Sequence, residues 1–216
     1  MIMITINFKK FSFVISIFLI LLITSCSSIK LKNDFNYVYI LESSSEGKQN
    51  HIGTCFYSNN KFYTNAHLVL YKELNKYVTA DTIIAKDEIN NINYELSLDS
   101  YDISNDIAIL SMDLKLGGGL SIIRNYQATI GENIFTIGNL NNYGLAYAYG
   151  KITSGLKTFT NLGSNITYVQ TNIEISGGNS GGPVFNEKNN VIGIMSLKLT
   201  DNGQYVDGVS FFVKIY

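Results

Sequence analysis

One serine in this chain has the surroundings that acyl-transfer chemistry requires. Ser180 lies in residues 177–183, the run Gly-Gly-Asn-Ser-Gly-Gly-Pro. A serine hydroxyl attacks a carbonyl when a base takes its proton, and the oxyanion that forms needs backbone N–H donors. Glycines on both sides permit a tight turn whose N–H groups point inward, although glycine-rich turns are also common without a function. We expect the N–H groups of Gly178 and Ser180 to form an oxyanion hole.

The chain has two histidines that could act as the base. His67 follows a β-rich run that ends in Thr-Asn-Ala, and it precedes Leu-Val-Leu. A histidine at such a strand end can face a cleft, although it can also be a core residue with its hydrogen bonds satisfied. His51 begins a strand in a polar stretch, so we expect it at the surface. His67 is therefore the candidate base.

The third group must be a buried carboxylate that holds the histidine in one tautomer. Asp106 directly precedes the apolar residues 107–110, whereas Asp102 lies in a stretch that is more typical of a loop. A carboxylate at the end of a buried strand is costly unless it is paired. This cost favours Asp106 over Asp102 and predicts the order His–Asp–Ser along the chain.

The elements that would position these residues are short β-rich runs separated by turn residues, with no segment of helical period. Before a glycine run at 117–119 we expect strands at 37–41, 51–57, 61–65, 77–85, 91–98 and 106–112. After it we expect strands at 133–137, 145–153, 165–173, 183–185, 191–199 and 208–216. The pattern predicts an all-β fold of two six-stranded antiparallel barrels, residues 37–114 and 130–216, with the active site between them. A single β-sandwich has similar spacing.

Composition excludes several classes of function. Of the 216 residues, 46% are apolar and 15% are charged, which is enough for a core and argues against disorder. The net charge is −1, and the only basic cluster is Lys9-Lys10, so nucleic acid is not an expected partner. We find no cofactor motif and no metal-ligand cluster, and expect neither group. Cys55, in an apolar run, is expected to be a buried small hydrophobic residue.

The N-terminus has the layout of a secretory signal at residues 1–25. Lys9-Lys10 precedes an uncharged, mostly apolar run at 11–23, and Thr-Ser-Cys26 follows. The run is shorter than the ~20 residues of a membrane-spanning helix, although residues 2–6 could lengthen it into an uncleaved anchor.

Residues 23–26, Ile-Thr-Ser-Cys, resemble the lipobox of bacterial lipoproteins. The resemblance implies that the Cys26 thiol carries diacylglycerol and that Cys26 becomes the first residue after cleavage. Residues 26–36 would then form a polar tether, and Cys55 would have no disulfide partner. The protein is expected to be exported and anchored by acyl chains to the outer side of the cytoplasmic membrane or at the cell surface.

Three segments resemble the catalytic segments of trypsin-like serine proteases. They are residues 64–67 (Thr-Asn-Ala-His), 105–110 (Asn-Asp-Ile-Ala-Ile-Leu) and 178–183 (Gly-Asn-Ser-Gly-Gly-Pro). Their order is that of the chymotrypsin fold. Residues 150–154 and 208–213 are similar to strands of bacterial Deg/HtrA proteases, and the likeness covers 37–216. It implies a serine endopeptidase that acts on polypeptides through His67, Asp106 and Ser180.

The sequence differs from the patterns of these proteases in two places, and each difference leads to an expectation. The chain ends at Tyr216, so we expect no PDZ domain after the protease domain, and the oligomeric state stays open. Asn179 stands where the trypsin type has an aspartate that pairs with a newly cut N-terminus, so we expect no zymogen activation of that kind.

Substrate specificity has the weakest signal. The resemblance implies a P1 pocket walled by residues 174–176 and 194–197, and we expect Glu174, Ile194 and Ser196 to line it. Glu174 lies six residues before Ser180 and would favour Lys or Arg at P1. It could equally be a surface residue, and the Deg/HtrA likeness implies small or medium apolar P1 residues.

Two other functions stay open. One is a catalytically silent, protease-like surface lipoprotein that acts as a binding module. The other is an esterase, but its nucleophile elbow would be followed by a helix, and no helical pattern follows Ser180.

Overall fold

The computed structural model describes residues 34–161, 164–201 and 204–216. The predicted signal peptide, Cys26 and nearly all of the predicted tether lie outside these residues. The described residues form fifteen strands and four short 3-10 helices. None of these helices has the length and apolar character needed to cross a membrane.

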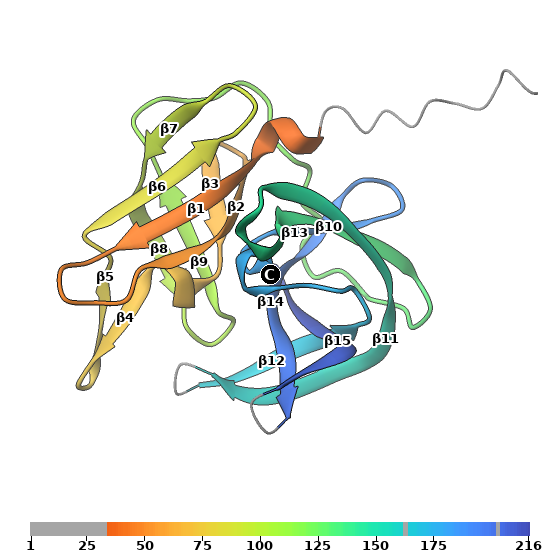
Figure 1. The fold of residues 1–216 in the computed structure, drawn as a ribbon. Helices are drawn as coiled ribbons and strands as arrows, with labels where there is room; N and C mark the ends of the chain where they lie inside the picture. The colour runs from red at the N-terminus through yellow and green to blue at the C-terminus, as the bar shows by residue number, and fades with distance from the viewer. Residues whose placement is uncertain (1–33, 162–163, 202–203) are drawn as a thin grey trace, which may run out of the picture. The chain divides into compact units, whose positions relative to one another are not determined.

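The first half is one curled antiparallel sheet with a small hairpin beside it (Figure 1). The strand order in the sheet is β7-β6-β1-β2-β3-β9-β8. Its strands are β1 (Val38–Ser44), β2 (His51–Ser58), β3 (Lys61–Thr64), β6 (Thr82–Asp87), β7 (Ile92–Glu95), β8 (Ser97–Asp102) and β9 (Ile107–Ser111). The hairpin pairs β4 (Leu70–Glu73) with β5 (Lys76–Thr79).

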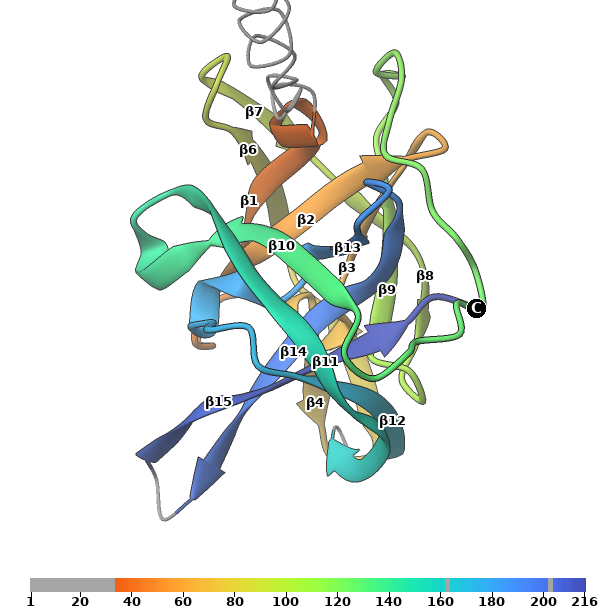
Figure 2. The same cartoon turned by 90° about the vertical axis from the view of Figure 1, so that its right-hand side faces the viewer.

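The second half is a closed six-stranded barrel in the order β10-β11-β12-β15-β14-β13. Its strands are β10 (Asn133–Asn139), β11 (Leu145–Asn161), β12 (Ser164–Thr171), β13 (Pro183–Asn186), β14 (Val191–Asp201) and β15 (Gln204–Lys214). Figure 2 shows the β14–β15 hairpin extending beyond the rest of the barrel. The four 3-10 helices are η1 (Asp34–Tyr37), η2 (Ala66–Leu68), η3 (Leu140–Asn142) and η4 (Gly177–Asn179).

The all-β prediction is confirmed, and the first half has more strands than the six expected. The predicted strand at 77–85 is two strands, because β5 pairs with β4 in the hairpin whereas β6 pairs with β1 and β7 in the main sheet. The predicted strand at 91–98 covers β7 and the start of β8. Asp102, expected in a loop, ends β8 and pairs with Ile107.

Aromatic side chains fill the interior of both halves. In the first half Tyr57 and Phe62 meet edge to face at 5.0 Å, and in the second Phe135 and Phe185 stack at 4.7 Å. Such pairs add to the free energy of apolar burial, which drives the folding of a chain of this composition. Cys55 is fully buried in the first core, and burial raises the pKa of its thiol. The prediction of a small buried hydrophobic residue at Cys55 is confirmed.

Candidate active site

Two neighbouring strands bring the predicted base and acid together. His67 lies in η2, just after β3, and Asp106 directly precedes β9, which pairs with β3. Two hydrogen bonds join the residues: His67 Nδ1 lies 2.8 Å from Asp106 Oδ2, and the His67 backbone N–H donates to Oδ1 at 3.0 Å. A carboxylate on Nδ1 directs the other ring nitrogen, Nε2, outward as an acceptor.

The backbone of Asp106 is held in a conformation that few residues adopt. Its φ is +53°, in the left-handed region that aspartate and asparagine tolerate better than most side chains. Its carbonyl accepts the Ala66 N–H at 3.2 Å and the Asn65 side-chain amide at 2.9 Å. Asp106 is fully buried, whereas the carboxylate of Asp102 is exposed and bonds only to Ser104 and Asn105. The structure therefore joins Asp106, and not Asp102, to His67.

The third predicted residue, Ser180, lies at the C-terminal end of η4 and is 8% exposed. Its hydroxyl donates to the Ser196 carbonyl at 2.7 Å, and the Ser196 hydroxyl donates to Asp106 Oδ2 at 2.8 Å. Ser180 and Asp106 thus meet at a shared neighbour. In this resting arrangement the Ser180 hydroxyl bonds to Ser196 and not to His67. A transfer of the Ser180 proton to His67 would require the hydroxyl to leave the Ser196 carbonyl.

Ser196 was predicted to line a substrate pocket, and the structure places its side chain in contact with Asp106. It gives Asp106 a hydrogen bond that stabilises the ionised carboxylate. Ile194 was predicted to line the same pocket, and this is also corrected. Its side chain is fully buried in the core of the second barrel, because the strand alternation at β14 turns it inward. No sequence motif distinguishes the role of Ser196, which depends on a contact across 90 residues.

The glycine run forms a turn that only glycine fits. Ser176 precedes η4 in a capping box with Asn179, whose side-chain oxygen accepts the Ser176 N–H at 3.0 Å. A Cβ on Gly178 would lie 2.0 Å from the Asn139 carbonyl oxygen. Gly181 has φ +85°, and a Cβ there would lie 2.0 Å from the Thr54 carbonyl oxygen. The turn therefore requires glycine at both positions.

Residues 177–179 form a 3-10 turn that carries the two predicted oxyanion-hole donors, the N–H groups of Gly178 and Ser180. Within this turn the Asn179 N–H donates to the Ser176 carbonyl at 3.0 Å. The oxyanion hole itself stays a prediction.

Adding a methyl group at Gly178 is expected to disrupt this turn. Gly178→Ala should lower the free energy of unfolding by about 1–3 kcal/mol, since the Cβ would collide with the Asn139 backbone, and should lower hydrolytic activity. Gly177→Ala is the matched control, because a Cβ there meets no atom within 4 Å. Thermal unfolding and kcat/KM of both variants test this. Equal stability of the two variants would contradict it.

Ser180, the predicted nucleophile, belongs to the second half but is hydrogen-bonded to the first. The Thr54 N–H on β2 donates to the Ser180 carbonyl at 2.8 Å, and the Thr54 hydroxyl donates to the Gly178 carbonyl at 2.7 Å. The Gly181 N–H donates to the Asn65 side chain at 2.7 Å. Asn179 is fully buried, and its side-chain NH2 has no partner among the described residues. These bonds position Ser180 against the half that carries His67 and Asp106.

The environment of His67 sets its protonation range. Burial alone would lower the pKa of the imidazole, but the Asp106 charge and hydrogen bond outweigh burial and raise the pKa above its ordinary 6.5. A general base must be neutral to accept a proton. We expect kcat/KM to fall as the pH drops through a midpoint above 6.5, which a pH–rate profile measures. A midpoint below that value would contradict the assigned pairing with Asp106.

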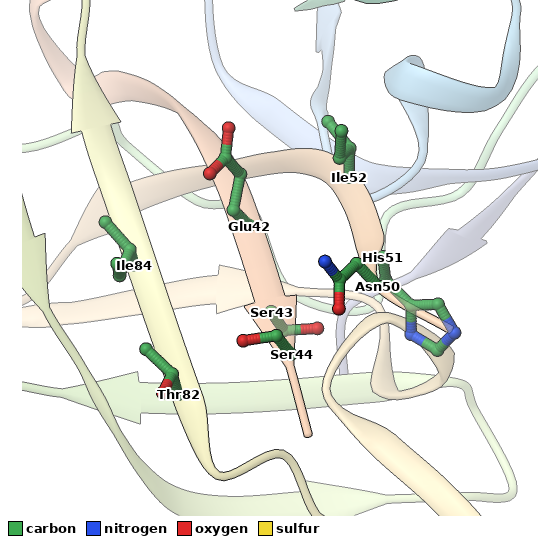
Figure 3. A pocket seen from close by; sticks show the side chains of 8 residues that line it. All are labelled: Glu42, Ser43, Ser44, Asn50, His51, Ile52, Thr82 and Ile84. Atoms are coloured by element: carbon green, nitrogen blue, oxygen red, sulfur yellow. The ribbon is translucent and has the colours of Figure 1, made fainter. Parts of the chain in front are cut away.

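An open cleft of about 310 Å³ lies beside His67 and the glycine turn. Its lining includes Asn50, His51, Ile52, Asn142 and Gly178. The same residues 50–52 also line a smaller hollow of about 160 Å³ (Figure 3). The other walls of this hollow come from β1 and β6, with Glu42 on β1 and Ile84 on β6. The surface beside His67 thus has room for an extended chain.

His51 was expected at the surface, and it partly lines both depressions. It stacks on Tyr71 at 5.0 Å, and its Nδ1 lies 3.2 Å from the Leu68 carbonyl. Among the residues that the structure describes, no group of three or more His, Cys, Asp or Glu could hold a metal ion.

This fold agrees with comparisons to known proteins. The sequence model of the family described as "Trypsin-like peptidase domain" matches residues 53–194. The chain therefore belongs to the trypsin-like peptidase family.

Within that family the chain is similar to Deg/HtrA-type proteases. It is 31% identical over 110 residues to a probable periplasmic serine endoprotease DegP-like of Pseudomonas putida, over 51% of this chain and 23% of that protein. It is 27% identical to the serine endoprotease DegS of Haemophilus influenzae, over 70% of this chain and 43% of that protein. The chain thus spans less than half the length of these relatives. The solved structure titled "HtrA-type protease AlgW with tripeptide" is 25% identical, with a TM-score of 0.67, over 83% of this chain and 56% of that chain.

Proposed function

We propose that this protein is a serine endopeptidase that hydrolyses exported or surface-encountered polypeptides. The observation that supports this best is the buried Asp106 carboxylate, which binds both His67 Nδ1 and the Ser196 hydroxyl, with the Ser180 hydroxyl on the Ser196 carbonyl. The cleft beside His67 and Gly178 supplies room for a substrate chain.

The chemistry begins when the Ser180 hydroxyl turns from the Ser196 carbonyl toward His67 Nε2. Ser180 Oγ attacks the carbonyl carbon of the substrate, and its proton passes to Nε2 while Asp106 stabilises the imidazolium. The tetrahedral oxyanion accepts hydrogen bonds from the N–H groups of Gly178 and Ser180.

Collapse of this intermediate breaks the peptide C–N bond, and His67 returns its proton to the departing amine. The acyl group then remains on Ser180 as an ester. A water molecule, deprotonated by His67, attacks the ester, and the proton goes back to Ser180 as the acid leaves. No metal or cofactor is required for these steps.

The site of action follows from the N-terminal sequence and the relatives. The signal-like residues 1–25 and the lipobox-like residues 23–26 favour export and acylation of Cys26. The Pseudomonas putida relative is named a periplasmic endoprotease. We therefore place the protein outside the cytoplasmic membrane of a bacterium, tethered through Cys26.

The test is covalent labelling with a fluorophosphonate, followed by mapping of the modified residue. The expected result is one adduct, on Ser180, together with cleavage of an unfolded protein substrate that the label abolishes. Absence of both the adduct and the cleavage from a folded protein would instead favour a protease-like binding module.

A further inference from the structure

One lysine bridges the two segments that flank the nucleophile. Lys198 lies on β14, two residues after Ser196. Its ammonium nitrogen is 3.1 Å from Oε2 of Glu174, which precedes η4, and 3.2 Å from Oδ1 of Asp207, on β15. The Glu174 carboxylate also accepts the Gly208 N–H at 2.7 Å. The lysine side chain therefore crosses from the strand after the serine to the segment before it.

The position of Ser196 connects this lysine to the reacting atoms. The Ser196 carbonyl is 2.7 Å from Ser180 Oγ, so β14 passes directly beside the nucleophile. The substrate carbonyl carbon must come within about 3–3.5 Å of that Oγ. The side chain of the same substrate residue, P1, is attached to the Cα atom that is bonded to this carbonyl carbon. Lys198 lies two residues beyond Ser196 on β14, about 7 Å along an extended strand, a span comparable to a P1 side chain of four or five heavy atoms.

The exposures of the three charged groups differ. The Lys198 side chain is 10% exposed, whereas those of Glu174 and Asp207 are 62% and 90% exposed. Ion pairs with exposed carboxylates contribute little to stability, because water solvates the released carboxylate well. A lysine with so little exposure cannot regain full hydration without moving. The carboxylates are therefore the partners that a substrate can replace at low cost.

We propose that Lys198 selects substrates with an acidic P1 residue, glutamate or aspartate, whose carboxylate takes the place of Glu174 or Asp207 on the lysine ammonium. This inference rests on the proposed peptidase function. A basic P1 residue would face the ammonium of Lys198, and an apolar one would lie against a charged group without pairing with it. The preference for Lys or Arg predicted from Glu174 competes with this proposal at the same site, where Lys198 pairs with that carboxylate.

The protonation state of Lys198 suits this role. Burial lowers the pKa of the ammonium, but hydrogen bonds to Glu174 and Asp207 outweigh burial and hold the pKa above its usual value. Lys198 is therefore charged at neutral pH.

The test compares peptides that differ only at P1: Glu, Asp, Gln, Leu and Lys. Glutamine has nearly the shape of glutamate without its charge, so the Glu-to-Gln ratio isolates the charge. We expect kcat/KM for Glu to exceed that for Gln by about 10- to 100-fold, the effect of one hydrogen bond between charged groups. This ratio is measured on the unmodified protein and requires no variant.

Lys198→Met then tests the assignment to this residue. The variant should lose the preference for Glu over Gln while it still cleaves the Leu peptide. Lys188→Met is the matched control, since Lys188 is exposed in the turn between β13 and β14. It should keep the preference of the unmodified protein.

Three results would overturn the inference: equal rates for Glu and Gln, fastest cleavage after Lys or Leu, or an acidic preference that Lys198→Met leaves intact. In all three the fluorophosphonate adduct still forms on Ser180, so the proposed peptidase function survives. Failure to cleave every peptide, with no adduct on Ser180, would overturn the proposed function and the inference together.

Discussion

Ser180→Ala is expected to lower kcat/KM for peptide hydrolysis by a factor on the order of 10⁶. The variant has no nucleophile, so His67, Asp106 and the oxyanion donors can assist only direct attack by water. Fold and stability should change little, because the hydroxyl makes one hydrogen bond, to the Ser196 carbonyl. The measurement is initial-rate kinetics on one peptide, with circular dichroism and thermal unfolding to verify the fold.

The control for this prediction is Ser121→Ala, at an exposed serine before the second barrel. It should keep both the activity and the fluorophosphonate labelling of the unmodified protein. A Ser180→Ala protein that is folded and still hydrolyses peptides at the original rate would remove Ser180 from the mechanism. The same result would show that the activity of the protein cannot be inferred from its likeness to the family.

Asp106→Asn is expected to lower kcat by a factor on the order of 10⁴. Its effect on the free energy of unfolding should be smaller than that of Asp106→Ala, because asparagine has nearly the shape of aspartate. Asparagine tolerates the φ of +53° and keeps an acceptor oxygen for the His67 N–H. It loses the charge that stabilises the imidazolium, and its amide can hold the imidazole in the wrong tautomer. An alanine at this position would mix these effects with backbone strain.

The pH profile separates this electrostatic role from a loss of structure. Since Asp106 raises the pKa of His67, residual activity in Asp106→Asn should have its acid midpoint at a lower pH than in the unmodified protein. Asp102→Asn is the control, because the exposed Asp102 bonds only to its own turn and should leave the profile unchanged. An unchanged kcat in Asp106→Asn would reject the assignment of Asp106 as the orienting acid.

Local sequence was enough to propose the three residues, but not to predict the contacts that the structure places between them. Glycines around Ser180 and the apolar run after Asp106 are signals within a few positions of the residue itself. The contact between His67 and Asp106 depends on the pairing of β3 with β9, whose paired residues lie 44 to 48 positions apart, from Thr64 with Ala108 to Phe62 with Leu110. Pairing at that separation leaves no periodic mark in a single sequence.

The same limit explains the residues whose roles were missed. Ser196 and Lys198 look like ordinary members of a β-rich run, and the contacts on which we base their proposed roles come from residues distant in the sequence. The β4–β5 hairpin was overlooked because its turn uses Leu74 at φ +52° instead of glycine or proline. The β11 strand continues to Asn161, beyond its expected end at 153, because β12 pairs with it across two bulges.

The bonds of Thr54 have a consequence for how activity is acquired. Neither half contains a complete site: the base and acid belong to the first, the nucleophile and its turn to the second. The Thr54 bonds to Gly178 and Ser180 form only when the halves meet, so enzymatic activity would be the last property regained on refolding. Recovery of activity would therefore measure the docking of the two halves. Burial of the aromatic side chains would measure the earlier formation of each half. A protein split between β9 and β10 would then be active only as a reassembled pair.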